Sequence, residues 1–216
     1  MVNTMVMLRE LTVNDLSEIA AVHIAAFPTS ALTKLGRGVV ERYYIWQLTG
    51  PHQVSAVGAC VQDRLVGFYI GGTFNGAMEG FLRENRRALA LAVLRRPWLL
   101  LTNPIFRQRL LMAFKILTKK LRRRFKRRKP ASTPRRVPSF GVLAIAVDPA
   151  YQGQGIGQAL MKEADRVART RGFARMELGV HVDNHQAIRF YEQSGWMRIS
   201  QNGEWKGQME KYLTPE

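Results

Sequence analysis

Several features common in proteins are scarce in this chain of 216 residues, and each absence excludes a class of protein or a kind of site. A single cysteine, Cys60, excludes a disulfide framework and a cysteine-ligated metal cluster, and it favours a reducing compartment. The first ten residues have neither a charged n-region nor an apolar h-region, so we expect no signal peptide. The longest uncharged run in the basic part of the chain, 97–106, is about half the ~20 residues of a spanning helix. We therefore expect a cytoplasmic protein without a membrane span.

Acidic residues are nearly missing from one segment. Residues 83–136 contain 19 Lys and Arg and one acid, Glu84, while the rest of the chain holds 14 bases and 15 acids. The net charge of +17 therefore belongs to this segment rather than to the whole chain. Such an asymmetry indicates an anionic partner.

The basic segment is predicted to be a helical insertion over 76–138 within one domain spanning 1–216. Helix formers fill 81–94, and apolar residues recur at helical spacing over 105–125, before a proline-rich linker over 130–138. Apolar side chains alternating with Arg and Lys over 81–129 are typical of helices that lie on an anionic membrane surface. Peripheral attachment to the inner face of the cell membrane is our hypothesis for this segment.

The most informative stretch is 143–160, LAIAVDPAYQGQGIGQAL. An apolar run predicts a buried strand, a glycine-rich loop follows, and an amphipathic segment from Gln158 to Arg171 predicts a helix. Glycines let the backbone approach a ligand, and the first turn of a helix offers free N–H donors, so this order predicts a phosphate site. The glycine spacing fits neither the dinucleotide fingerprint nor the nucleoside-triphosphate P-loop.

Two motifs resemble those of the GNAT superfamily of acyl-CoA N-acyltransferases. Gln152, Gly155 and Gly157 fill the fixed positions of [QR]-x-x-G-x-[GA]. The segment from Asn184 to Trp196 is similar to the family's N-x-x-A-x-x-x-Y-x-x-x-G-[FW], at the usual separation. The resemblance covers 140–213 and extends to 5–75, but it does not cover 76–138.

The resemblance implies a mixed α/β fold: a mostly antiparallel central sheet flanked by helices. It also implies acetyl-CoA as co-substrate, with the backbone of Ile145, Ala146 and Val147 pairing with the pantetheine arm. Gln152 and Asn184 are further candidates for contact with the cofactor, although Asn184 can equally be a simple helix N-cap. The pyrophosphate would be cradled by Gly153, Gln154, Gly155, Ile156, Gly157 and Gln158.

Candidate catalytic residues follow from the chemistry of acetyl transfer, which needs a proton acceptor for the amine and a donor for the leaving thiolate. Tyr191 is the candidate acid, because phenol and thiol pKa values lie close together; a packing role is the alternative. In the related ribosomal-protein acetyltransferases a glutamate stands five residues before the Asn, where this chain has Gly179. Glu177 and His181 flank that position, so either is a candidate base or a surface residue. The remaining histidines show no metal-ligand spacing, and we expect no metal.

Three functional hypotheses result. The first is an N-acetyltransferase in which a small-molecule amine attacks acetyl-CoA directly within a ternary complex, the acceptor being an amino sugar or a lipid-linked glycan precursor at the membrane. The second is acetylation of a protein or peptide amine. The third is a non-catalytic module that binds nucleic acid through 83–136, which the aliphatic rather than aromatic residues between the bases disfavour.

Overall fold

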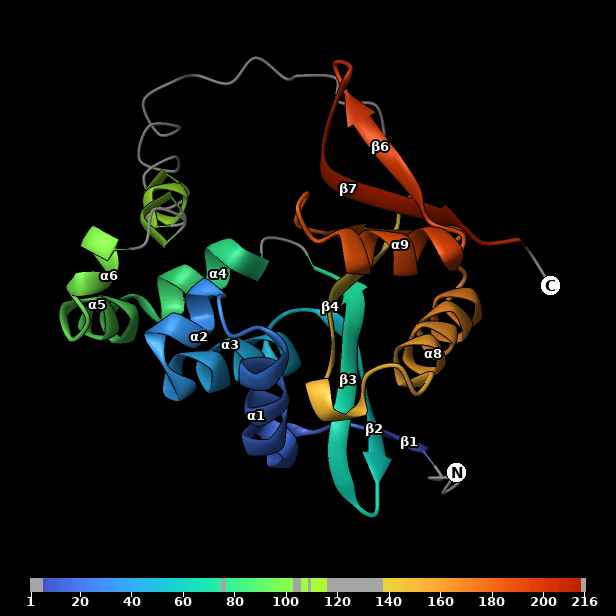
Figure 1. The fold of residues 1–216 in the computed structure, drawn as a ribbon, viewed down its shortest axis with the longest axis horizontal. Coiled ribbons are helices and arrows are strands. Elements are labelled where there is room, and N and C mark those ends of the chain that lie inside the picture. Colours follow the sequence, from blue (N-terminus) through green and yellow to red (C-terminus); the bar gives the residue numbers. More distant parts are fainter. Residues whose placement is uncertain (1–5, 75–76, 103–105, 109, 116–137, 215–216) are drawn as a thin grey trace. The chain divides into compact units, whose positions relative to one another are not determined.

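The computed structural model describes residues 6–74, 77–102, 106–108, 110–115 and 138–214 (Figure 1). These residues fall into two compact units, which we describe separately. The first unit comprises Met1–Thr12, His52–Phe74 and Arg136–Glu216, and the second comprises Val13–Pro51 and Asn75–Arg135.

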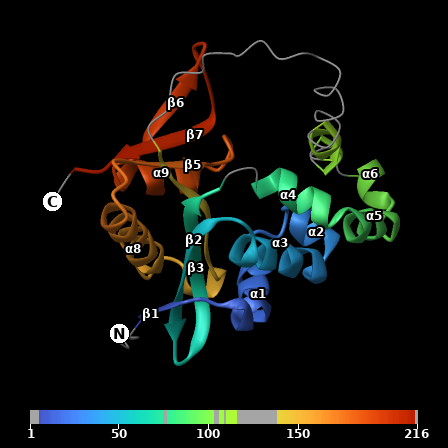
Figure 2. The same cartoon turned by 180° about the vertical axis from the view of Figure 1, so that it is seen from behind.

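The first unit is built on a sheet of seven strands in the order β1-β2-β3-β4-β5-β7-β6. Every neighbouring pair is antiparallel except β4 and β5, which run parallel. Figure 2 shows β5 beside β7 on the side of the sheet that carries α9. The mixed, mostly antiparallel sheet predicted from the sequence is confirmed. The strands are β1 (Met7–Glu10), β2 (Gln53–Val61), β3 (Arg64–Thr73), β4 (Phe140–Val147), β5 (Arg175–Gly179), β6 (Met197–Gln201) and β7 (Glu204–Tyr212).

Two helices of this unit pack on one face of the sheet: α8 (Ile156–Thr170) and α9 (His185–Gln193). Leu160 and Ala164 of α8 are fully buried in a core with Tyr69, Phe140 and other strand residues. The buried residues of α8 recur every three or four positions, so burial of an apolar stripe fixes the helix on the sheet.

Short turns join the antiparallel strands as their residue types demand. Gln62 and Asp63 between β2 and β3 both have positive φ, and so do Asn202 and Gly203 between β6 and β7. Two successive positive φ values are typical of a type I′ turn, whose twist matches that of the flanking strands. Asn-Gly, the pair at 202–203, is the dipeptide that this turn type favours.

The second unit is helical. Its elements are a 3-10 turn (Val13–Asp15), α1 (Leu16–Ala26), α2 (Ala31–Leu35), α3 (Arg37–Thr49), α4 (Ala77–Glu84), α5 (Arg86–Leu94) and α6 (Trp98–Thr102). Residues 106–108 and 110–115 are also helical. The predicted helix over 81–94 is in fact two helices, because α4 begins at Ala77 and ends before Asn85. At the junction Asn85 has φ −103° and ψ 12°, and the Phe81 carbonyl accepts from both the Asn85 side-chain amide at 3.1 Å and the Asn85 N–H at 3.0 Å.

A buried polar chain joins α1 to α3 within this unit. His23 is 6% exposed, its Nδ1 lies 2.7 Å from the Tyr44 hydroxyl, and its Nε2 lies 3.2 Å from Ser30 Oγ. Burial lowers the pKa of His23 from its ordinary 6.5 to about 4, because the charged imidazolium loses its hydration. The imidazole is therefore neutral at physiological pH and acts as a hydrogen-bonding core residue.

The predicted organisation, one domain over 1–216 with an insertion over 76–138, remains a prediction. The part of it over 116–137, including most of the basic run and the proline-rich linker, lies outside the described residues.

Candidate functional site

The site is organised around strand β4, which loses its neighbour part-way along. Pairing between β4 and β5 covers Phe140, Gly141 and Val142, and within the described residues no pair continues it. On its other edge β4 remains paired with β3 as far as Val147. The backbone groups of 143–147 that face away from β3 consequently have no strand partner among the described residues.

A bulge explains why the two strands separate. Val142 pairs with Gly71 and Ala144 with Ile70, so Leu143 is an extra residue in β4. A bulge bends its strand and increases the local twist. Beyond this point β5 instead follows β7, and the Val180 N–H donates to the Gly207 carbonyl at 2.8 Å. An extended ligand with amide groups could pair with the exposed edge of β4 as a further strand would.

The loop after β4 is shaped by side-chain amides. Gln152 Nε2 donates to the Val147 carbonyl at 3.0 Å, and Gln154 Nε2 donates to the Ala150 carbonyl at 3.4 Å. Asp148 accepts from the Ala150 N–H at 3.0 Å and begins a 3-10 turn (Pro149–Tyr151). The fixed glutamine of the motif therefore braces the loop against the end of β4.

Two glycines take the chain from this loop into α8. Gly153 and Gly155 have φ values of +77° and +79°, in the left-handed region that favours glycine. A Cβ atom at either position would meet no heavy atom within 4 Å, so the backbone is open on that side. Gly155 caps α8 without a side-chain hydrogen bond, and the first turn contains no acidic residue. The free N–H groups at Ile156, Gly157 and Gln158 and the positive end of the helix dipole thus face an open surface suited to phosphate.

Gly157 brings α8 close to α9. A Cβ atom there would lie 3.6 Å from Phe190, an ordinary contact, so alanine would also fit, as the [GA] position of the motif allows. Phe190 packs edge-to-face on Tyr191 at a centroid distance of 5.3 Å, and Tyr191 packs on Trp196 at 6.1 Å. The candidate acid thus belongs to an aromatic cluster joined to the glycine loop.

Tyr191 is 8% exposed and belongs to the core of the first unit. Burial raises the pKa of its phenol from 10.0 to about 12, because the phenolate would be poorly solvated. No hydrogen bond joins its hydroxyl to another described residue. Packing and a donor role at the hydroxyl are compatible in this position.

Asn184 is the N-cap of α9. Its Oδ1 accepts from the Ala187 N–H at 3.1 Å, which occupies the carboxamide oxygen. The side chain is otherwise exposed, so its amide nitrogen and the second lone pair of its oxygen are available to a ligand. The capping interpretation is therefore realised in the structure, and contact with a cofactor remains a prediction.

Comparison with known proteins agrees with this geometry. The Acetyltransferase (GNAT) family profile matches residues 127–196, which contain β4, the glycine loop, α8 and α9. In the structure of the PaiA N-acetyltransferase from Thermoplasma acidophilum in complex with coenzyme A, the fold aligns with a TM-score of 0.56 over 96% of this chain and 99% of that one, at 14% identity. Over residues 127–196 the sequence therefore matches the GNAT family.

Among curated relatives, this chain is 41% identical over 59 residues to the mycothiol acetyltransferase of Beutenbergia cavernae, an alignment covering 27% of this chain and 20% of that protein. It is 44% identical over 52 residues to the [ribosomal protein bS18]-alanine N-acetyltransferase of Escherichia coli, covering 24% of this chain and 35% of that protein. The chain thus spans well under half the length of these relatives.

The two candidate bases have different surroundings. Glu177 Oε1 lies 2.6 Å from an Arg175 guanidinium nitrogen, and the same guanidinium lies 3.1 Å from Glu210 on β7. Arg175 and Glu177 are two residues apart and so share a face of β5, a pairing that strand alternation could have revealed in the sequence. The Glu177 carboxylate is therefore already engaged.

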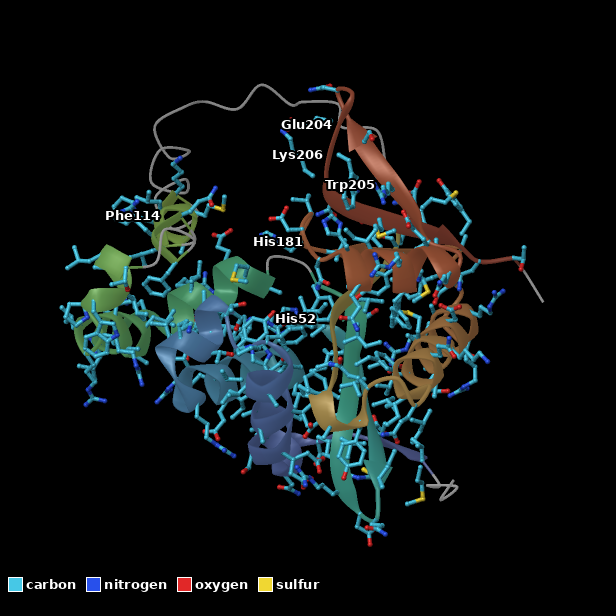
Figure 3. The ribbon with its side chains drawn as sticks, in the orientation of Figure 1. His52, Phe114, His181, Glu204, Trp205 and Lys206 are labelled. Carbon is cyan, nitrogen blue, oxygen red and sulfur yellow. The ribbon has the colours of Figure 1, made fainter. Side chains whose placement is uncertain are left out.

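His181 follows the end of β5 and is exposed, with Nδ1 3.5 Å from an Asp183 carboxylate oxygen. It lies below the Glu204–Lys206 end of β7 in Figure 3. Asp183 was not among the residues singled out by sequence, since an acid two positions from a histidine is a weak signal in a loop. His181 thus lies two residues after Gly179, at the end of β5. Among the described residues, no group of three or more His, Cys, Asp or Glu side chains could hold a metal ion.

Proposed function

We propose that this chain is an acetyl-CoA-dependent N-acetyltransferase acting on a primary amine by direct attack in a ternary complex. The observation that carries the proposal is the continuity of two features: a strand edge over 143–147 without a partner among the described residues, and the α8 N-terminus directly after it. An arm with amides that ends in a pyrophosphate is complementary to that sequence of groups. Coenzyme A has this construction.

The chain's own residues would hold the co-substrate mainly through backbone atoms. Ile145, Ala146 and Val147 would pair with the pantetheine arm, and the N–H groups from Gly153 to Gln158 would bind the pyrophosphate. Bound in this way, acetyl-CoA supplies a thioester carbonyl carbon to the incoming amine. Gln152 holds the loop in position, and Asn184 fixes the start of α9.

Two side chains would handle protons. His181 takes the proton that the amine nitrogen loses as its bond to the carbonyl carbon forms. The Tyr191 hydroxyl would donate a hydrogen bond to the sulfur as the carbon–sulfur bond breaks. The departing thiolate would then take a proton from water, and His181 would release the amine's proton to water. Glu177 is the weaker candidate for the base, because Arg175 already engages its carboxylate.

For the acceptor we favour an amino sugar or a lipid-linked glycan precursor at a membrane surface. The basic helices favour an anionic surface. The alternative is a protein or peptide amine, the kind of substrate for which the E. coli relative is named. Gly179 in place of the glutamate expected in such enzymes argues against simple transfer of a ribosomal-protein substrate.

Calorimetric titration with acetyl-CoA, beside coenzyme A and ATP, tests the proposal. The Gly155→Glu variant should lose acetyl-CoA binding, because it places a carboxylate at the pyrophosphate site. Gly172→Glu is the matched control: Gly172 follows the opposite end of α8, has φ +74°, and a Cβ there also meets nothing within 4 Å. Both variants place a glutamate at a positive φ and add one negative charge, so they should differ only in their affinity for acetyl-CoA.

Failure of the native chain to bind acetyl-CoA would refute the proposal and turn attention to the third hypothesis, a nucleic-acid-binding module. Equal loss of binding in both glycine variants would attribute the effect to destabilisation of α8. Binding of ATP as tight as that of acetyl-CoA would mean that the loop recognises a generic phosphate.

A further inference from the structure

The helices after β3 expose an unusual concentration of large apolar side chains. Of the 16 large hydrophobic residues exposed in the structure, nine lie between Met78 and Phe114. The most exposed members are Leu101 at 84% and Leu94 at 74%. Single exposed apolar residues need no explanation, but a concentration of them marks an interaction site.

We propose that this surface docks the protein on an anionic phospholipid bilayer. We define the apolar-basic surface by its apolar members, Leu91, Leu94, Trp98, Leu101, Leu111 and Phe114. Its exposed bases are Arg86, Arg87, Arg95, Arg107 and Lys115. Phe114, on the helical stretch 110–115, is labelled in Figure 3.

Among the described residues, no hydrogen bond or ion pair engages the side chains of Arg86, Arg87, Arg95 and Arg107. Arg96 is the exception, since its guanidinium donates to the Leu35 carbonyl at 2.5 Å and packs over Gly36. The acid in 83–115, Glu84, lies 3.3 Å from Arg83 and cannot neutralise the rest. The surface therefore presents net positive charge around apolar side chains.

This combination selects a bilayer among the anionic partners. A second copy of the same surface would bring like charges together, which disfavours self-association. Nucleic acid would satisfy the charge, but single strands stack on aromatic platforms, whereas four of the six apolar members are leucines. Leucine side chains flanked by Arg and Lys suit the boundary between acyl chains and anionic headgroups, where interfacial helices lie.

The helices have lengths that fit lying on a membrane. Helix α5 has 9 residues and α6 has 5. Across the part of the chain that the structure describes, no helix combines the length and apolarity needed to cross a bilayer. Docking on a bilayer would place the enzyme where a membrane-bound acceptor is found. That role rests on the proposed function, whereas the docking itself does not.

Flotation of the full chain with vesicles tests the inference. Vesicles of phosphatidylcholine alone are compared with vesicles in which phosphatidylglycerol replaces part of the phosphatidylcholine. We expect binding to the anionic vesicles only, weakened by salt. Equal binding to both, or to neither, would overturn the inference.

Variants then locate the surface. Leu94→Glu combined with Leu101→Glu should lower vesicle partitioning at least about tenfold for each leucine. Met197→Glu is the matched control, because Met197 is 52% exposed on β6, outside the surface. Arg87→Glu should lower binding by about fivefold or more, whereas Arg42→Glu, exposed on α3, should not.

Controls separate this inference from the enzymatic one and from other partners. Acetyl-CoA affinity by calorimetry should be unchanged in all four variants, which also reports folding. If the chain binds acetyl-CoA but no vesicles, only the membrane-docking proposal is refuted. If it binds vesicles but no acetyl-CoA, only the proposed enzymatic function is refuted. A dimer that the leucine substitutions dissociate would assign the surface to a second copy of the chain. Binding of single-stranded RNA that persists in the leucine variants, with no binding to vesicles, would assign the bases to nucleic acid.

Discussion

Removal of the Tyr191 hydroxyl should slow catalysis without weakening the fold. A phenol with a pKa of about 12 is a poor proton donor to a thiolate whose acid has a pKa near 8.5. The gap of about 3.5 units at 1.36 kcal/mol each makes complete transfer uphill by about 5 kcal/mol. We therefore expect the hydroxyl to stabilise the leaving sulfur by a hydrogen bond rather than to surrender its proton first.

The size of the effect follows from that role. A hydrogen bond to a charged group contributes about 1.5–3 kcal/mol, so Tyr191→Phe should reduce kcat about 10- to 150-fold. The KM for acetyl-CoA should change little, because the bond forms as the sulfur gains charge. The free energy of unfolding should stay within about 0.5 kcal/mol of the native value, since no described residue loses a partner.

Steady-state kinetics and urea unfolding of the same preparations check both expectations. Tyr43→Phe is the matched control, because Tyr43 is 7% exposed and burial also raises the pKa of its phenol to about 12. An unaltered kcat in Tyr191→Phe would refute the donor role and leave packing as the function of Tyr191. A fall in both kcat and stability would mean that the hydroxyl supports the core.

Three further predictions follow from the surroundings of single residues. His181→Asn should lower kcat/KM about 100-fold, which is the usual size of a general-base contribution. Glu177→Gln should lower kcat/KM less than about fivefold. The opposite order of effects in steady-state assays would make Glu177 the base. Asn184→Ala should cost about 1 kcal/mol of unfolding free energy through loss of the α9 cap, and Asn184→Ser should restore it; acetyl-CoA affinity that falls in both by calorimetry would assign the amide to the cofactor. The pKa of His23 is lowered to about 4, so the fold has its full stability above pH 6.5 and loses it progressively as the pH falls toward 4. About 2 kcal/mol of unfolding free energy should be lost by pH 5. A His23→Asn variant whose unfolding free energy has the same slope against pH would contradict this expectation.

The strand, loop and helix around Gly155 could be predicted because every signal is local. An apolar run, glycines and a helical stripe lie within twenty residues, and the structure places β4, the loop and α8 in that order. The predicted helix began at Gln158, whereas α8 begins at Ile156. Glycine at the cap hides the helix start, since it offers no capping side chain to find in a sequence.

The separation of β4 from β5 could not be predicted in the same way. It depends on the bulge at Leu143, which exists only as a change of register against β3, about seventy residues away in the sequence. Apolar patterning identifies a strand but leaves its partners open. Likewise, helix propensity over 81–94 did not reveal the break at Asn85, where the Phe81 carbonyl accepts from both the side chain and the backbone of Asn85.

The position of Gly179 explains why the cofactor side was easier to infer than the acceptor side. The cofactor contacts that we propose are made by backbone atoms, so a glycine pattern suffices to predict them, whereas a base must be a particular side chain. At Gly179 a Cβ would meet only Gln208 Nε2 at 3.4 Å, so the structure has room for a side chain that the sequence does not provide. Glu177 shares a face of β5 with Gly179, but Arg175 already engages its carboxylate. His181 follows the end of the strand, and we therefore expect His181 rather than Glu177 to take the proton of the acceptor amine.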